Sequence, residues 1–175
     1  AIHDAIFTNI AYSSSSSDYA GTAIELHGSD MAVSNNHFSA IGRIGVYVGF
    51  GSAAAITGNT YAGKGSGDFL DYGIEVGRNG HADISNNVIS DNAGVASADG
   101  SQSAGILVTS FFDPETPENS SGATITGNTI SNSDRGIAVG YDAADSSMVA
   151  AYRNAFSGNI VAVTSTYPAV DAAEN

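Results

Sequence analysis

Two residues with the chemistry to bind sugars occupy the same place in two copies of a short repeated phrase. In IGVYVG (44–49) this place holds Tyr47, and in YGIEVG (72–77) it holds Glu75. An aromatic face offers a flat apolar surface for a sugar ring, and a carboxylate accepts hydrogen bonds from sugar hydroxyls. We therefore predict a trough that binds polysaccharide. Its predicted ligand-binding residues are Tyr47, Glu75, Asp71, Tyr72, Phe111 and Phe112, with Leu107 in the floor and Asp68 on the rim.

The alternative is that these loops are variable surface decoration and that Glu75 is a solvated acid. A catalytic alternative pairs Glu75 with Glu25, which has the same place in TAIELHG (22–28), about 9.6 Å away at two strand spacings. Inverting glycosidases hold two carboxyl groups about 6.5–9.5 Å apart, but Tyr47 would stand between this pair. A lyase or epimerase would need a basic residue as a general base, but the basic residues are scattered along the chain. Arg78 and His81 come closest to forming a catalytic pair. The catalytic residues stay unknown, and this dispersal favours a non-catalytic protein.

Two acidic loops could bind calcium. Carboxylate oxygens are hard ligands of the kind that Ca²⁺ prefers, although neither loop matches an EF-hand. The alternative is that both loops are simply solvated, and we expect no other cofactor. The candidate metal ligands are Asp113, Glu115, Asp142 and Asp145.

The charge balance restricts the partners. Eighteen acids and five bases give a net charge of −13, which repels nucleic acid and anionic membranes. No run of residues reaches the length of about 20 apolar residues that a membrane span needs. We therefore expect no nucleic-acid partner and no membrane insertion, and polysaccharide remains the expected ligand. Cysteine is absent, so there are no disulfides.

An asparagine recurs at the centre of a second short phrase. The clearest copies are AVSNNHFSA (32–40), AAITGNTYA (54–62), ADISNNVIS (82–90) and ATITGNTIS (123–131). The Gly-Ile-x-Val phrase alternates with this one, and two alternating phrases predict a stacked solenoid. The marker asparagines are Asn36, Asn59, Asn87 and Asn128, with looser copies at Asn154 and Asn9.

The asparagine phrase must contain a bend. Ile125 and Ile130 are five residues apart, so strict strand alternation would put them on opposite faces. Both can face one core only if the chain turns between them, and Gly127-Asn128 can turn at little cost because Gly and Asn enter the left-handed region readily. The phrase is therefore two short strands, and Gly-Ile-x-Val is a third.

Three strands per coil of about 25–30 residues describe a parallel β-helix. The bend asparagines should stack and hydrogen-bond from coil to coil, because an amide has both donors and acceptors. The predicted inward stacks are Ile24, Val46, Ile74, Ile106, Ile137 and Ile160, and Val33, Ile56, Ile84 and Ile125.

Long insertions should raise walls beside the third strand. Residues 11–19, 63–72 and 91–103 precede that strand in three coils, and residues 109–122 follow it in another. Function in solenoids tends to lie where coils depart from the common pattern. These loops therefore place the trough over the middle coils.

Both phrases resemble the repeats of right-handed parallel β-helix proteins of the pectate-lyase-like superfamily. The resemblance implies an all-β, right-handed parallel β-helix of about six coils and a secreted or cell-surface location. It also allows a polysaccharide lyase, epimerase or glycoside hydrolase. The ending AVDAAEN resembles the closing phrase of bacterial surface β-helices, so we expect residues 1–175 to be one β-helix domain from a longer chain with flanking domains or coils. The predicted function is a non-catalytic extracellular module that acts as a spacer or a carbohydrate-binding face, and the alternative is a polysaccharide-active enzyme.

Overall fold

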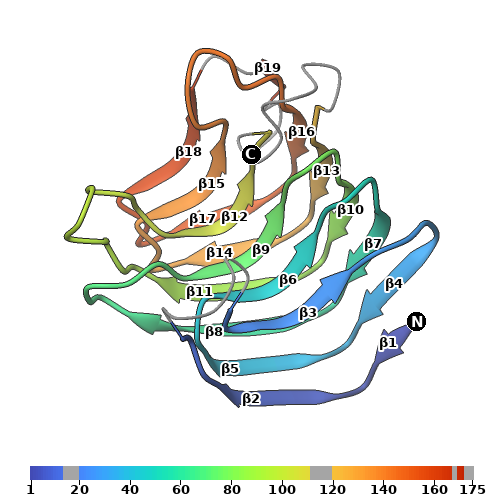
Figure 1. Ribbon diagram of the computed structural model, residues 1–175, viewed down its shortest axis with the longest axis horizontal. Coiled ribbons are helices and arrows are strands. Elements are labelled where there is room, and N and C mark those ends of the chain that lie inside the picture. Colours follow the sequence, from blue (N-terminus) through green and yellow to red (C-terminus); the bar gives the residue numbers. More distant parts are fainter. Residues whose placement is uncertain (14–19, 111–119, 167–168, 172–175) are drawn as a thin grey trace.

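The strands follow one another in a repeating order through three parallel sheets, which we name sheets A, B and C (Figure 1). The computed structural model describes residues 1–13, 20–110, 120–166 and 169–171. Each strand pairs with the strand three places further along the chain, so the chain winds once through all three sheets before it stacks on itself. This is a parallel β-helix, and its described residues include no helix.

The strand bounds show the coil repeat. Sheet A contains β1 (Ile2–His3), β4 (Met31–Ser34), β7 (Ala53–Thr57), β10 (His81–Ser85), β13 (Gly122–Thr126), β16 (Met148–Tyr152) and β19 (Ala169–Asp171). Sheet B contains β2 (Ile6–Ile10), β5 (His37–Ile41), β8 (Thr60–Gly65), β11 (Val88–Asn92), β14 (Thr129–Ser131) and β17 (Ala155–Ser157). Sheet C contains β3 (Thr22–Leu26), β6 (Ile44–Val48), β9 (Tyr72–Val76), β12 (Ala104–Val108), β15 (Arg135–Val139) and β18 (Val161–Ser165).

The bend between sheets A and B confirms the interpretation of the asparagine phrase. The residue before each marker asparagine takes a positive φ: 55° at Asn35, 66° at Gly58, 56° at Asn86 and 67° at Gly127. Glycine and asparagine adopt this conformation at the lowest steric cost. The first residue of each Gly-Asn or Asn-Asn pair therefore makes the bend, and the second turns its amide inward.

The inward amides form a ladder along the solenoid. From Asn59 onward, the side-chain oxygen of each ladder asparagine accepts from both the backbone N–H and the side-chain amide of the asparagine one coil before it. Asn59 Oδ1 accepts in this way from Asn36 at 2.9 and 3.0 Å, and Asn87 Oδ1 accepts from Asn59 at 2.9 Å twice. The ladder continues through Asn128 to Asn154, and all five residues are buried.

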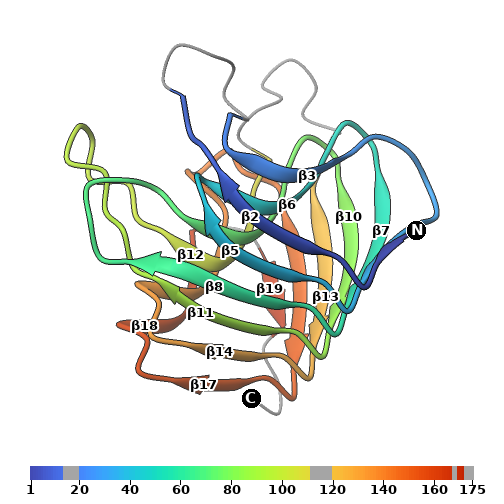
Figure 2. The ribbon, with the colours of Figure 1, turned by 90° about the horizontal axis from the view of Figure 1, so that it is seen from below.

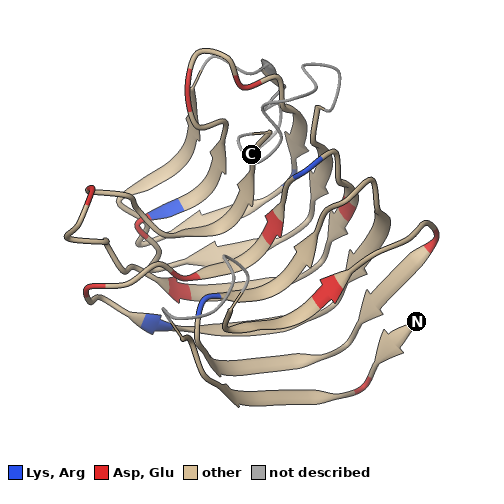
Figure 3. Ribbon diagram, viewed as in Figure 1, with Lys and Arg blue, Asp and Glu red and all other residues tan. Residues whose placement is uncertain are grey.

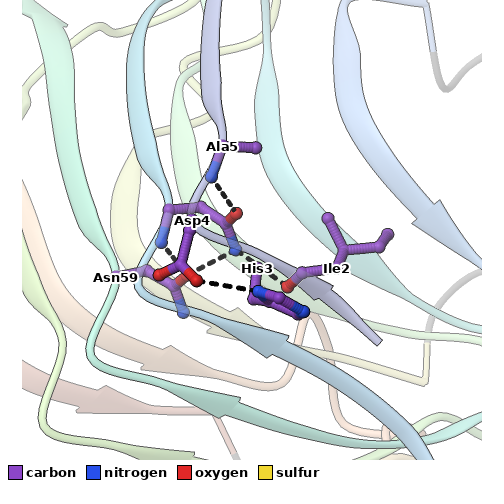
Figure 4. A network of polar contacts seen from close by, with 6 residues as sticks. Ile2, His3, Asp4, Ala5 and Asn59 are labelled. Atoms are coloured by element: carbon purple, nitrogen blue, oxygen red, sulfur yellow. Dashed lines mark hydrogen bonds and ion pairs between the residues drawn. The ribbon is translucent and has the colours of Figure 1, made fainter.

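The predicted first member of the ladder is wrong. Asn9 lies inside β2 of sheet B, between the register pairs Thr8–Ser39 and Ile10–Ile41, rather than at the bend. Ala5 holds the bend position instead, and its backbone N–H donates to Asn36 Oδ1 at 3.0 Å (Figure 4). The prediction was wrong because AIFTNIA (5–11) resembles the other asparagine phrases, but its asparagine lies four residues after the bend position Ala5.

The core lies between the three sheets. Sheet A contributes the predicted stack Val33, Ile56, Ile84 and Ile125, each 0% exposed. Sheet C contributes the predicted stack from Ile24 to Ile137, but its last member is Val163, not Ile160, which is 77% exposed in the turn before β18. The glycines of the Gly-Ile-x-Val phrase also face inward, and a Cβ on Gly73 would lie 2.8 Å from the Gly105 carbonyl oxygen. These glycines let sheet C approach the large side chains of sheet B closely.

Loops emerge at the predicted corners. The segments 66–71 and 93–103, between sheets B and C, project together beyond the coils (Figures 1 and 2). On the other side of sheet C, residues 140–147 connect β15 to β16. No helix in the described residues is long and apolar enough to cross a membrane.

Candidate ligand-binding site

The variable position of the Gly-Ile-x-Val phrase forms one column on the outer face of sheet C. The register aligns Glu25, Tyr47, Glu75, Leu107, Ala138 and Thr164 on successive strands. The sequence analysis predicted this alignment for Glu25, Tyr47 and Glu75. It did not predict that Tyr47 and Glu75 are buried, at 0% and 1% exposed. The loops on either side cover the middle of the column.

A pocket of about 420 Å³ lies over β9, β12 and β15. Glu75, Leu107 and Ala138 line it along the outward column. One wall is residues 99–102, held in a short hairpin by the bridge between Val95 and Gln102. Gly140 and Tyr141 line the pocket from the opposite corner. The wall from residues 99–102 belongs to an insertion that the sequence predicted, whereas the wall from residues 140–147 was not predicted. Most of the predicted insertions 11–19 and 109–122 lies outside the described residues.

Glu75 is the most unusual group in the pocket. Its Oε2 is buried and has no hydrogen-bond partner among the described residues. Burial raises the pKa of Glu75 to about 7, although the positive charge of Arg43 acts in the opposite direction. A buried carboxyl group without a partner is costly to a fold, and native structures usually satisfy such groups. A carboxyl group with a strongly shifted pKa in the lining of a pocket marks a candidate functional residue.

Four further polar residues surround Glu75, and none was among the predicted binding residues. Arg43 and Arg135 line the pocket, and Arg135 donates to the side-chain oxygen of Gln102. Asp99 also lines it, and its pKa lies below the usual value because the backbone N–H and hydroxyl of Ser101 hydrogen-bond to its carboxylate.

A signal for the arginines was present in the sequence. Arg135 begins RGIAVG, and Arg43 directly precedes IGVYVG. Both therefore lie at the entrance to a sheet C strand. Asp99 and Gln102 lie in an insertion without periodicity, so only the folded hairpin reveals where they face.

Tyr72, one of the predicted binding residues, also lines this pocket. It is 6% exposed, and its hydroxyl donates to the Gln102 carbonyl oxygen at 3.4 Å. Burial raises the pKa of Tyr72, the charge of Glu75 raises it further, and Arg43 and Arg135 lower it. The phenol is therefore neutral and available as a hydrogen-bonding group.

Tyr47 does not form part of the pocket, which corrects the prediction. Its ring lies against the corner after β6, where a Cβ on Gly49 would come within 2.4 Å of the ring. Phe50 contacts the ring edge-on with the centroids 5.9 Å apart. Tyr47 is therefore a packing residue beneath this corner.

Asp71 is a second correction, because it points away from the rim. It is fully buried, accepts from the Tyr61 hydroxyl at 2.5 Å and accepts from the Lys64 backbone N–H at 2.8 Å. Asp68 is exposed and accepts from the backbone N–H and hydroxyl of Ser97 at 2.7 and 2.6 Å. Both aspartates organise the loops that build one side of the pocket.

Asp145 has a comparable role at the other side. Its carboxylate accepts from the Thr109 hydroxyl and from the backbone N–H groups of Ser110, Tyr141 and Ser147. Burial raises its pKa, but these hydrogen bonds outweigh burial and hold the pKa below the usual value. Its oxygens are therefore occupied by protein donors, which anchor the loop that carries Tyr141.

The remaining calcium candidates find little support. Asp142 is exposed and accepts from the Ala144 backbone N–H at 2.8 Å. Within the described ranges, no group of three or more His, Cys, Asp or Glu residues could hold a metal ion. The predicted candidates Phe111, Phe112, Asp113 and Glu115 lie outside the described residues.

The other catalytic candidates separate in space. Glu25 lies two strands from Glu75 in the column, but it is exposed and contacts His27 Nε2 at 3.0 Å. The guanidinium of Arg78 lies over the Phe50 ring, 5.1 Å from its centroid, whereas His81 lies on β10 in sheet A. The expectation that acids and bases disperse is nevertheless wrong at one place, because two acids and two arginines converge on the sheet C pocket.

A larger hollow of about 800 Å³ lies over the outer face of sheet A. Its lining is dominated by alanines of β7, β10, β13 and β16, such as Ala54, Ala82 and Ala123. Small side chains make this hollow, and it lacks a convergent set of buried polar groups. Ligand sites combine apolar walls with a few placed polar groups, so we favour the sheet C pocket.

Comparison with known families agrees with the fold. Residues 22–167 match the family described as the right handed beta helix region. The chain therefore belongs to the right-handed β-helix family. No curated protein and no solved structure matches it.

Proposed function

We propose that this protein is a secreted or cell-surface β-helix module that binds carbohydrate in the sheet C pocket. The observation that carries the proposal is the convergence of charged and polar side chains on one pocket, which Glu75, Arg43, Asp99, Gln102 and Arg135 all line. Such groups donate to and accept from sugar hydroxyls.

The rest of the lining suits the same class of ligand. The pocket volume of about 420 Å³ lies within the range of about 300–1,000 Å³ that small-molecule sites have. Arg43, Arg135 and Gln102 offer donors, and Asp99 offers acceptors. Tyr141 is 56% exposed at the edge and could stack on a sugar ring. This mixture of donors, acceptors and one aromatic face is typical of carbohydrate recognition.

The second candidate is a polysaccharide-active enzyme. It is favoured by one observation, the pKa of about 7 at Glu75, since a general acid or base works best when its pKa lies near the operating pH. Arg43 or Arg135 would then neutralise charge on the substrate. We favour binding because Asp99, the other carboxyl group of the described lining, already accepts hydrogen bonds from Ser101, and no interaction among the described residues couples it to Glu75 as an acid–base pair.

A steric variant tests the binding proposal. Leu107 lies partly exposed in the pocket floor, so Leu107→Trp should fill the pocket and abolish saccharide binding in calorimetry against a panel of neutral and acidic oligosaccharides. Ala55→Trp is the matched control, because Ala55 is an outward residue at the centre of a sheet A strand. Unchanged binding by Leu107→Trp would refute the site. Release of unsaturated products or reducing ends from polysaccharides would favour the enzyme.

A further inference from the structure

The sheet C pocket is closed at one end of the outward column. Tyr47, which pairs in register with Glu75, is fully buried and is not part of the described lining. Tyr47 belongs to an apolar cluster, and Leu70 both packs against this cluster and lines the pocket. A ligand in the pocket therefore cannot continue along the column past Tyr47 toward Glu25.

Two loop walls close the pocket across the strands. Residues 99–102 stand at the corner between sheets B and C, and Tyr141 stands at the corner between sheets C and A. Both walls belong to loops that carry acidic residues and project beyond the strands (Figure 3). Hydrogen bonds hold them in place, because Arg135 donates to the side chain of Gln102 and the Tyr141 backbone N–H donates to Asp145 at 3.0 Å. A sugar chain that crossed sheet C here would have to pass through these walls.

The remaining side of the pocket faces strand β18. Thr166, which directly follows β18, lines the pocket. All five residues of β6 and all five of β9 are buried, whereas none of the five residues of β18 is. The outward column is therefore closed toward β6 and accessible toward β18, where Thr164 is its member.

A pocket of this shape suits the end of a chain. An internal segment of a polysaccharide needs a groove with two open ends, whereas a pocket with one closed end admits a terminal sugar only. The volume of about 420 Å³ lies near the lower limit of the range of about 300–1,000 Å³ for small-molecule sites. Leu107 offers a partly exposed apolar floor for the face of a sugar ring, and Asp99 and Gln102 offer hydrogen-bonding groups to its hydroxyls.

We propose that the sheet C pocket binds the terminal sugar of a glycan chain and that the rest of the chain leaves over Ala138 toward Thr164. This inference rests on the proposed carbohydrate-binding function and goes beyond it by specifying which part of a glycan is recognised. The two ends of a sugar chain differ in chemistry, and the polar wall at residues 99–102 differs from the opposite wall at Tyr141. The pocket therefore accepts one end of the chain and leaves the other end outside.

The test presents the same saccharides in two orientations. Cellotetraose, xylotetraose, mannotetraose, chitotetraose and tetragalacturonate are coupled to one surface through the reducing end and to a second surface through the non-reducing end. The protein should bind a saccharide in one orientation and lose binding in the other, because coupling at the end that enters the pocket prevents entry. Leu107→Trp should lose the orientation-dependent binding, and the control Ala55→Trp should retain it.

Each result distinguishes this inference from the proposed function. Equal binding in both orientations would show that internal segments are recognised, which overturns the inference and leaves carbohydrate binding intact. Binding of the free tetrasaccharides in calorimetry but of neither coupled form would show that both ends are enclosed, which also overturns it. If the free tetrasaccharides do not bind, or if Leu107→Trp binds them as the wild type does, both proposals fail.

Discussion

Replacement of Glu75 by glutamine should change how the stability of the protein depends on pH. Glu75 is 1% exposed, and burial raises its pKa from 4.5 to about 7. The folded protein therefore binds a proton on this group at pH values where the unfolded chain has already released it. Ionisation of Glu75 in the folded protein therefore lowers the free energy of unfolding. This loss is absent well below pH 4.5, grows as the pH rises, and is complete above about pH 7.

The size of the effect follows from the two pKa values. The full difference corresponds to about 3 kcal/mol of unfolding free energy, of which about 2.5 kcal/mol develops between pH 5 and pH 8. Glutamine cannot ionise, so Glu75→Gln should lack this component. Other groups titrate equally in both proteins, which makes the difference between their pH profiles the informative quantity.

Urea denaturation at pH 5, 6, 7 and 8 measures this difference. The wild type should lose about 2.5 kcal/mol more than Glu75→Gln over this range. Glu25→Gln is the matched control, since Glu25 occupies the same outward column but is exposed, and it should follow the wild type. Parallel profiles for the wild type and Glu75→Gln would show that Glu75 is an ordinary solvated acid, and the account of the pocket would be refuted.

Three further substitutions test how the fold positions the pocket. Asn87→Ala should lower the free energy of unfolding by at least about 3 kcal/mol in urea denaturation, because it leaves buried hydrogen-bonding groups on both neighbouring coils without partners. A loss below about 1 kcal/mol would contradict the ladder. Ala5→Asn should extend the ladder to the first coil and raise the free energy of unfolding by about 1 kcal/mol. A lower melting temperature than the wild type would contradict this prediction. Gly49→Ala should destabilise by about 1–3 kcal/mol, because its Cβ would overlap the Tyr47 ring, and wild-type stability would show that the ring moves aside freely.

The fold was predictable because its signals are local and repeated. A buried amide ladder needs asparagine at one point in every coil, and a tight bend needs Gly or Asn just before it. The spacing of Ile125 and Ile130 was enough to place that bend. The two wrong assignments, Asn9 in the ladder and Ile160 in the sheet C stack, fall in the first and last coils. The repeated phrases are least regular there, and each end strand has only one neighbouring strand with which its sequence can be aligned.

The site was predictable only in part. Alternation put Glu75 and Leu107 outward, and the length of the 91–103 insertion put one wall beside them. The closure of those walls depends on contacts between loops, such as Asp68 with Ser97 and Asp145 with Tyr141, which have no period in the sequence. For the same reason, the burial of Glu75 could not be predicted from the spacing of residues, although the places of Arg43 and Arg135 at the start of sheet C strands could have been.

The position of a bound ligand tests the central claim most directly. The protein, labelled with ¹⁵N, should be titrated with neutral and acidic disaccharides while its backbone amide resonances are followed. The account predicts that the largest shifts fall on the pocket residues Ser101, Gln102, Leu107 and Ala138. Shifts confined to the alanine-rich face of sheet A, or no shifts at high disaccharide concentration, would contradict it.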